Sequence, residues 1–278
     1  MRLRSLLFVP GDRPERMEKA LGCGADALIL DLEDSVTPAK KDGARAEVAG
    51  FLARTDTEVG LWVRINPLDS GMTRDDLAAA RGADGIVLPK AASGTDVAAL
   101  AAMLGDEPAR ILPIATETPA AIFGLGSYAG CSPRLAGITW GAEDLPAAIG
   151  AESSREADGS YTPPYEMIRA LTLFGAHAAD VAAIETVYPD FRNLEGLAAY
   201  CARAMRDGFT GMMAIHPAQV ETINAAFTPS DAAVAHARRV VAAFAESPDA
   251  GALQLDGRMI DAPHLKQAQA LLRRAGLA

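Results

Sequence analysis

Acidic and basic side chains follow several short apolar runs of this sequence, at positions where they could do chemistry together. The set comprises Asp31, Glu33, Asp34, Arg64, Glu117 and Asp144. Carboxylates gathered at one place repel one another unless they are protonated or neutralised by a cation. Because oxygen ligands suit Mg²⁺ or Mn²⁺, the pattern predicts a divalent-metal site.

Glu117 and Asp144 are the predicted metal ligands. Any single acidic residue after a strand is more often a solvated loop carboxylate, and this interpretation stays open for each of the two. Their position after two neighbouring apolar runs, with three more acids expected nearby, favours a bound metal. Two carboxylate ligands leave coordination positions for water and a chelating substrate.

Three basic residues lie where they could meet an anionic substrate. Arg64 either forms a structural ion pair with Asp31 or Glu33, or binds a substrate oxygen through its planar guanidinium group. Lys90 either pairs with an acid or acts as a Schiff-base nucleophile, and neighbouring acids favour pairing because they raise the pKa of a lysine. Arg13, after a Pro-Gly turn, is a further candidate for substrate binding.

Three other features give weaker indications of function. His216 precedes a proline and has no second histidine near it, so we do not assign it as a ligand. The Gly124-Leu-Gly126 pattern follows a helical segment, which leaves a dinucleotide fingerprint unsupported. On the sequence alone, Asp261 is an N-cap of the last helix.

A repeat of βα units would bring the reactive residues to one edge. Apolar runs are each followed by turn residues and a longer, Ala-rich segment, which is the pattern of such units. We predict strands over Ser5–Val9, Ala27–Leu32, Leu61–Ile65, Gly85–Leu88, Ile111–Ala115, Leu135–Trp140, Val181–Ile184 and Gly211–Ile215. Eight strands predict an α/β fold of the (β/α)₈ TIM-barrel type, with its active site at the carboxyl ends of the strands.

The C-terminal part lies outside the eight repeats. We predict a helix that begins at Ser230 or Asp231, a loop over residues 251–261 and a final helix from about Ala262 to Ala275. The 278 residues therefore divide into a TIM-barrel catalytic domain, residues 1–228, and a C-terminal helical appendage or lid, residues 229–278.

Composition narrows the function classes. A formal net charge of −10 argues against nucleic acid and membrane partners. No run approaches the roughly 18 apolar residues of a membrane span. The three cysteines are widely spaced, so we expect reduced thiols in a cytoplasmic protein.

Ordered motifs along nearly the whole chain identify a family resemblance. They are Arg4–Arg13 (RSLLFVPGDR), Leu30–Val36 (LDLEDSV), Val63–Pro67 (VRINP), Ile86–Lys90 (IVLPK), Glu117-Thr118, Gly141–Leu145 (GAEDL), Ile215–Gln219 (IHPAQ) and Gly257–Asp261 (GRMID). Together they resemble the citrate lyase beta-subunit-like branch of the HpcH/HpaI aldolase/citrate lyase family. One departure is Glu185, where many relatives carry aspartate, and we expect its extra methylene to reshape the pocket.

The resemblance implies an activity. It indicates an Mg²⁺-dependent carbon–carbon (oxo-acid) lyase that cleaves a 3-hydroxyacyl-CoA thioester of the malyl-, citramalyl- or hydroxymethylglutaryl-CoA type to acetyl-CoA and an oxoacid. Alternatives are a citrate lyase beta subunit acting on citryl-acyl-carrier protein, a malyl-CoA thioesterase, and an inert barrel subunit of a lyase complex. A homo-oligomer, trimeric or hexameric, is expected.

The resemblance also implies residue roles. Glu117 and Asp144 match the metal ligands, and Arg64 matches an arginine that contacts substrate near the thioester. Glu33 and Asp34 match acids that hold metal-bound water. Asp261 matches an acid on a lid that reaches a neighbouring subunit's site.

Overall fold

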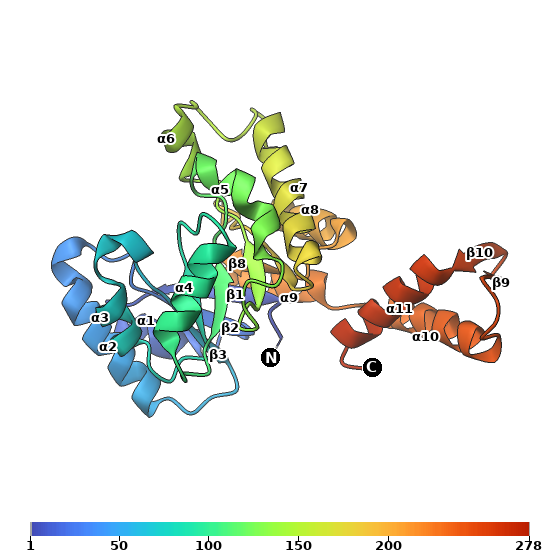
Figure 1. The fold of residues 1–278 in the computed structure, drawn as a ribbon, viewed down its shortest axis with the longest axis horizontal. Helices are drawn as coiled ribbons and strands as arrows, with labels where there is room; N and C mark the ends of the chain where they lie inside the picture. Colours follow the sequence, from blue (N-terminus) through green and yellow to red (C-terminus); the bar gives the residue numbers. More distant parts are fainter. Residues whose placement is uncertain (1, 278) are drawn as a thin grey trace. The chain divides into compact units, whose positions relative to one another are not determined.

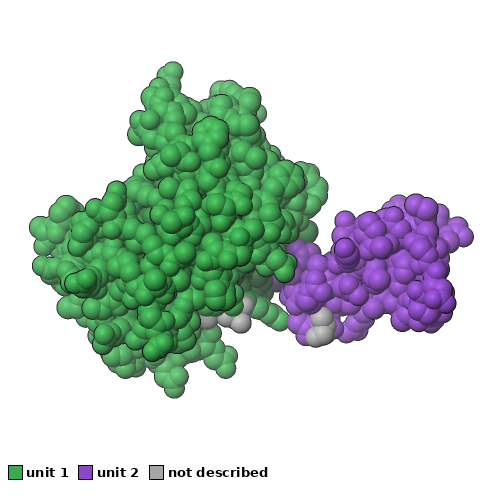
Figure 2. All heavy atoms as spheres, viewed as in Figure 1, with its two compact units in different colours: residues 1–224 green, residues 225–278 purple. Residues whose placement is uncertain are grey.

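The computed structural model describes residues 2–277, which form a parallel α/β barrel and a smaller C-terminal unit (Figure 1). By its contacts the chain separates into two compact units, Met1–Asn224 and Ala225–Ala278 (Figure 2). This division concerns packing only, and the functional division into a catalytic barrel and a lid stays a prediction. Within the described residues, no helix is long and apolar enough to cross a bilayer.

The barrel strands lie within two residues of the predicted ones at either end. They are β1 (Ser5–Pro10), β2 (Ala27–Asp31), β3 (Gly60–Arg64), β4 (Gly85–Leu88), β5 (Arg110–Pro113), β6 (Gly137–Thr139), β7 (Ala182–Glu185) and β8 (Gly211–Ala214). They run parallel in the order β5-β4-β3-β2-β1-β8-β7-β6. Bridges from Ile111 to Leu135 and from Ile114 to Thr139 join β5 to β6. The predicted TIM-barrel fold is therefore confirmed.

Helices alternate with the strands. They are α1 (Pro14–Ala20), α2 (Lys41–Arg54), α3 (Thr73–Ala79), α4 (Gly94–Leu104), α5 (Pro119–Gly124), α6 (Leu145–Ile149), α7 (Pro163–Ala178), α8 (Leu194–Asp207) and α9 (Val220–Phe227). Short 3-10 turns occur at η1 (Pro38–Lys40), η2 (Leu68–Ser70), η3 (Leu125–Tyr128) and η4 (Pro217–Gln219). A proline begins α1, α5 and α7, where its missing N–H leaves no helical hydrogen bond unmade.

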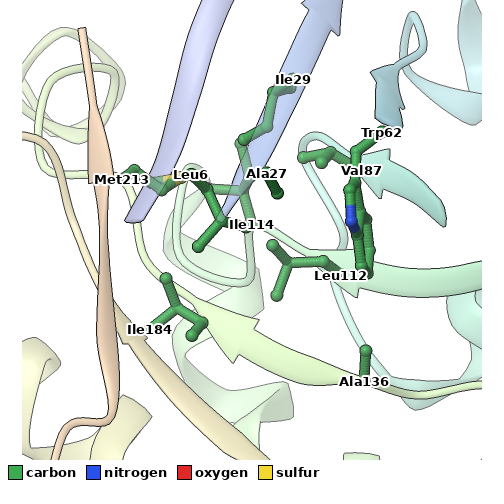
Figure 3. Packing of buried hydrophobic residues seen from close by; sticks show 10 residues of the cluster. All are labelled: Leu6, Ala27, Ile29, Trp62, Val87, Leu112, Ile114, Ala136, Ile184 and Met213. Carbon is green, nitrogen blue, oxygen red and sulfur yellow. The ribbon is translucent and has the colours of Figure 1, made fainter. Parts of the chain in front are cut away.

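The barrel interior is an apolar core (Figure 3). It contains Leu6, Ala27, Ile29, Trp62, Val87, Leu112, Ile114, Ala136, Ile184 and Met213. The Trp62 ring needs glycine opposite it, since a Cβ on Gly85 would lie 2.3 Å from the indole. Because this interior is filled, polar side chains gather at the ends of the barrel.

The second unit packs α10 (Asp231–Glu246) and α11 (Ala262–Arg274) with a hairpin of β9 (Ala252–Leu255) and β10 (Arg258–Asp261). The prediction of a loop over residues 251–261 was wrong. Asp256 and Gly257 both have positive φ, at 53° and 77°, as a two-residue type I′ hairpin turn requires. The predicted start of α10 is confirmed, because the Ser230 side chain accepts a hydrogen bond from the Ala233 N–H.

Candidate active site

A cavity of about 380 Å³ lies at the carboxyl ends of the strands. Its polar lining residues include Asp31, Asp34, Ser35, Arg64, Glu117, Glu143, Asp144 and Thr186, and its apolar ones include Phe8, Ile114, Val187, Met213 and Ile215. Ile114 and Met213 also belong to the barrel core, so the floor of the cavity continues that core. A hollow of about 600 Å³ beside α3 and α4 is larger, but it lies away from the strand ends that carry these groups.

Glu117 lies beyond β5 and is only 4% exposed. Its Oε2 accepts a hydrogen bond of 2.5 Å from the Lys90 N–H, and Lys90 adopts a left-handed φ of 52° there. Burial, aided by the charges of Glu33 and Asp144, raises the pKa of Glu117 to about 8. The ionised carboxylate is therefore unfavourable until a cation compensates it.

Asp144 lies beside Glu117 on the same cavity. It is the N-cap residue of α6 and follows β6 after Trp140-Gly-Ala-Glu. The glycine in this segment is required, because a Cβ on Gly141 would lie 2.9 Å from Cγ of Glu117. The structure thus brings the two predicted metal ligands to one place.

Arg64 is held by two acids from the end of β2. Its Nε and Nη2 donate to the two oxygens of Asp31, each at 2.7 Å, and its Nη1 lies 2.8 Å from Oε2 of Glu33. Burial alone would raise the pKa of Asp31, but the hydrogen bonds from Arg64 hold it below its usual value. The structural ion pair is therefore present, and Arg64 still lines the cavity.

Glu33 joins Arg64 to Lys90. Its Oε1 accepts a hydrogen bond of 3.0 Å from Lys90 Nζ, and burial raises the pKa of Glu33. Its Oε2 is buried and accepts no hydrogen bond of good geometry, despite the short contact to Arg64. Burial alone would lower the pKa of Lys90, yet Glu33 raises it above its usual value. This favours the pairing interpretation of Lys90 over the Schiff-base one.

The other predicted residues differ in where they lie relative to the cavity. Asp34 lines the cavity with a side chain that is 58% exposed. Arg13 is the N-cap of α1, 49% exposed, and does not line the cavity, whereas Arg16 does. Asp261 belongs to the second unit, where its Oδ1 lies 2.6 Å from Nδ1 of His264.

Glu185, whose extra methylene was expected to reshape the pocket, does not line the cavity itself. It is fully buried, and its carboxylate accepts hydrogen bonds from Trp140 Nε1 at 2.5 Å and from Arg169 Nε at 2.7 Å. The longer side chain of glutamate serves this ion pair beside the barrel, and Thr186 and Val187 contribute to the cavity instead.

Lys41 is a residue of the site that the sequence did not reveal. Its buried Nζ donates to the carbonyls of Leu32 and Glu33 and to Oδ1 of Asn66, at 2.7 to 2.8 Å. These bonds fix the segment that presents the acids after β2. A lysine at the start of a helix gave no signal of this role.

The acidic pair suits a hard divalent cation. Within residues 2–277, neither Glu117 nor Asp144 forms an ion pair, while Asp31 and Glu33 are both paired with basic side chains. No group of three His, Cys, Asp or Glu side chains with metal-site geometry occurs in the same described range. Glu117 and Asp144 would supply two oxygen ligands and leave the others to water or substrate.

Comparison with known proteins shows the family of the chain and a relative that binds magnesium. Residues 4–217 match the model of the HpcH/HpaI aldolase/citrate lyase family. Two proteins of Cereibacter sphaeroides are similar over 98% of this chain and 94% of their own length: a (3S)-malyl-CoA thioesterase at 35% identity and an L-malyl-CoA/beta-methylmalyl-CoA lyase at 32%. The crystal structure of the Mycobacterium tuberculosis protein CitE with magnesium, acetoacetate and coenzyme A has 36% identity and a TM-score of 0.83, covering 99% of this chain and 98% of that one.

Proposed function

Because the chain belongs to the HpcH/HpaI aldolase/citrate lyase family, we propose that it is an Mg²⁺-dependent carbon–carbon lyase that cleaves a 3-hydroxyacyl-CoA thioester. The malyl-, citramalyl- and hydroxymethylglutaryl-CoA types are the proposed substrates, and acetyl-CoA and an oxoacid the products. The observation that carries the proposal is that Glu117 and Asp144, which form no ion pair within residues 2–277, meet Arg64 on one cavity. The magnesium and coenzyme A in the CitE crystal support the choice of cofactor and substrate class.

Glu117 and Asp144 would hold the metal. When bound, Mg²⁺ supplies Lewis-acid polarisation of the substrate's hydroxyl and carboxylate oxygens. Glu33 and Asp34 are proposed to accept hydrogen bonds from water around that site. Mn²⁺ prefers similar oxygen ligands and is expected to substitute.

Arg64 would stabilise the negative charge that forms on the thioester oxygen when the carbon–carbon bond breaks. Its Nε and Nη2 each donate a hydrogen bond to Asp31 and its Nη1 lies 2.8 Å from Glu33, and the N–H groups that these acids leave free are proposed to bind the substrate. Its pKa is raised by those acids against the effect of burial, so it keeps its charge. Donors fixed in advance in this way are commonly worth several kcal/mol to a transition state.

Asp261 is proposed as the acid that protonates the resulting enolate. The proposal places it on a lid that acts on a neighbouring subunit of a homo-oligomer, and it rests on the Gly257–Asp261 motif. Arg13 and Lys90 are proposed to bind the anionic parts of the substrate. A lid is useful because free access of water would quench the carbanion without selectivity.

A thioesterase is the second candidate, favoured by the 35% identity to the malyl-CoA thioesterase. One experiment separates the candidates: malyl-, citramalyl- and hydroxymethylglutaryl-CoA are supplied with Mg²⁺, and oxoacid, acetyl-CoA and free CoA are followed over time. Acetyl-CoA as the first thiol product supports the lyase, and free CoA supports the thioesterase. Citryl-acyl-carrier protein in the same panel tests the citrate lyase alternative.

The metal site is tested alongside by Glu117→Ala and Asp144→Ala. We expect both variants to keep their circular dichroism spectrum and to lose metal-dependent turnover. Unchanged turnover in both would remove the proposed site. Absence of Mg²⁺ binding to the wild-type protein, measured by calorimetry, would favour the inert-subunit alternative.

A further inference from the structure

The two segments that carry Glu117 and Asp144 are joined by one side chain, that of Thr116. Its hydroxyl accepts a hydrogen bond of 3.0 Å from the Gly141 N–H and donates one of 3.1 Å to the Gly141 carbonyl. Thr116 is fully buried and directly precedes Glu117. We propose that Thr116 is a positioning residue that sets the spacing of Glu117 and Asp144 for a divalent cation, an inference that rests on the proposed function.

The position of this contact in the barrel explains why a side chain is needed. β5 and β6 are joined by isolated bridges instead of a continuous ladder, and the last backbone bond of that seam is Ala115 N–H to the Thr139 carbonyl, at 2.9 Å. One residue farther on, the hydroxyl of Thr116 makes the connection instead. It thus extends the pairing of the two strands to the point where the acidic residues begin.

A shift of Gly141 would displace both acids. The absent Cβ of Gly141 leaves the room in which Cγ of Glu117 lies, and Asp144 follows three residues later. On the other side, Trp140 is fixed by its hydrogen bond to Glu185. Gly141 is therefore held from two sides, by the Thr116 hydroxyl and by the fixed Trp140. Of these two contacts, the one from Thr116 is on the side of Glu117.

The neighbouring strand offers a matched control. Thr139 is as fully buried as Thr116, but its hydroxyl has no hydrogen-bond partner among the described residues. A threonine-to-valine change has the same shape at both positions, yet only at Thr116 does it remove two hydrogen bonds, and it takes their partner from the N–H and carbonyl of half-buried Gly141.

The experiment measures Mg²⁺ binding by calorimetry and thermal unfolding of the metal-free protein. We expect Thr116→Val to weaken Mg²⁺ binding about tenfold, the lower end of the usual range for residues that support metal ligands, while Thr116→Ser and Thr139→Val bind as wild type does. Equal affinity of wild type and a folded Thr116→Val overturns the inference alone. Absence of Mg²⁺ binding to wild type overturns the proposed metal site together with it.

A second variant covers the case in which Thr116→Val does not fold. Gly141→Ala places a methyl group against Cγ of Glu117 and is expected to weaken Mg²⁺ binding by at least the same factor. An unchanged affinity of Gly141→Ala would overturn the inference, because Gly141 would then not determine where the carboxylates lie.

Discussion

Glu117 should make the stability of the metal-free protein depend on pH. Its pKa rises from a usual value of 4.5 to about 8 in the fold, chiefly through burial. The folded state thus holds this proton more tightly than the unfolded state does. Stability is therefore lost as pH rises from about 4.5 to 8. The difference between the two pKa values corresponds to roughly 5 kcal/mol in the free energy of unfolding.

The test compares wild type with Glu117→Gln after chelation of divalent ions. Glutamine keeps an oxygen for the Lys90 N–H and cannot ionise. Between pH 5 and 8 the free energy of unfolding of wild type should fall, relative to the variant, by about 1.4 kcal/mol per pH unit. Urea denaturation followed by circular dichroism gives both curves, and exposed Glu152→Gln serves as a control that should run parallel to wild type.

Excess Mg²⁺ at pH 8 completes the test. It should raise the free energy of unfolding of wild type by neutralising the Glu117 carboxylate. The same addition should raise that of Glu117→Gln much less. If the wild-type and Glu117→Gln curves run parallel from pH 5 to 8, then burial does not penalise this carboxylate and the electrostatic case for the metal fails.

Three further outcomes are expected. Arg64→Lys should lower kcat/KM about 100-fold with unchanged Mg²⁺ affinity, because lysine lacks the planar fork that Asp31 orients; steady-state kinetics that match wild type would contradict this. Arg169→Met should cost roughly 3 to 5 kcal/mol in urea denaturation, since it leaves Glu185 buried without its cation, and a loss under 1 kcal/mol would speak against the pair. Asp261→Asn should reduce kcat about 100-fold without changing Mg²⁺ affinity, and full activity would exclude Asp261 as the acid.

The barrel strands were predictable because strands buried on both faces are nearly continuous apolar runs. β2 and β4 are buried along their whole length and read as such in the sequence. The hairpin of β9 and β10 was missed because its strands have four residues each, and only one of these eight residues, Ile260, is buried. The Asp256-Gly257 turn was the available signal, and we interpreted it as a loop.

Positions after strand ends were enough to predict that Glu117, Asp144 and Arg64 meet, because all strands of a parallel barrel end at the same mouth. The sequence left open which acid pairs with which base, since this depends on side-chain distances of a few ångströms. The structure assigns Asp31 and Glu33 to Arg64. For the same reason, the three hydrogen bonds of Lys41 could not be foreseen.

The ion pairs divide the acids at the mouth into two groups with different consequences. Asp31 and Glu33 hold Arg64 and Lys90, so recruiting either acid to a metal would release the largely buried guanidinium of Arg64 or the half-buried ammonium of Lys90. Glu117 has the backbone N–H of Lys90 as its partner, so binding a metal through Glu117 would release no charged side chain. Arg64 is therefore expected to hold the same orientation with and without a metal, which leaves the N–H groups that do not contact Asp31 or Glu33 ready for the substrate before the cation arrives.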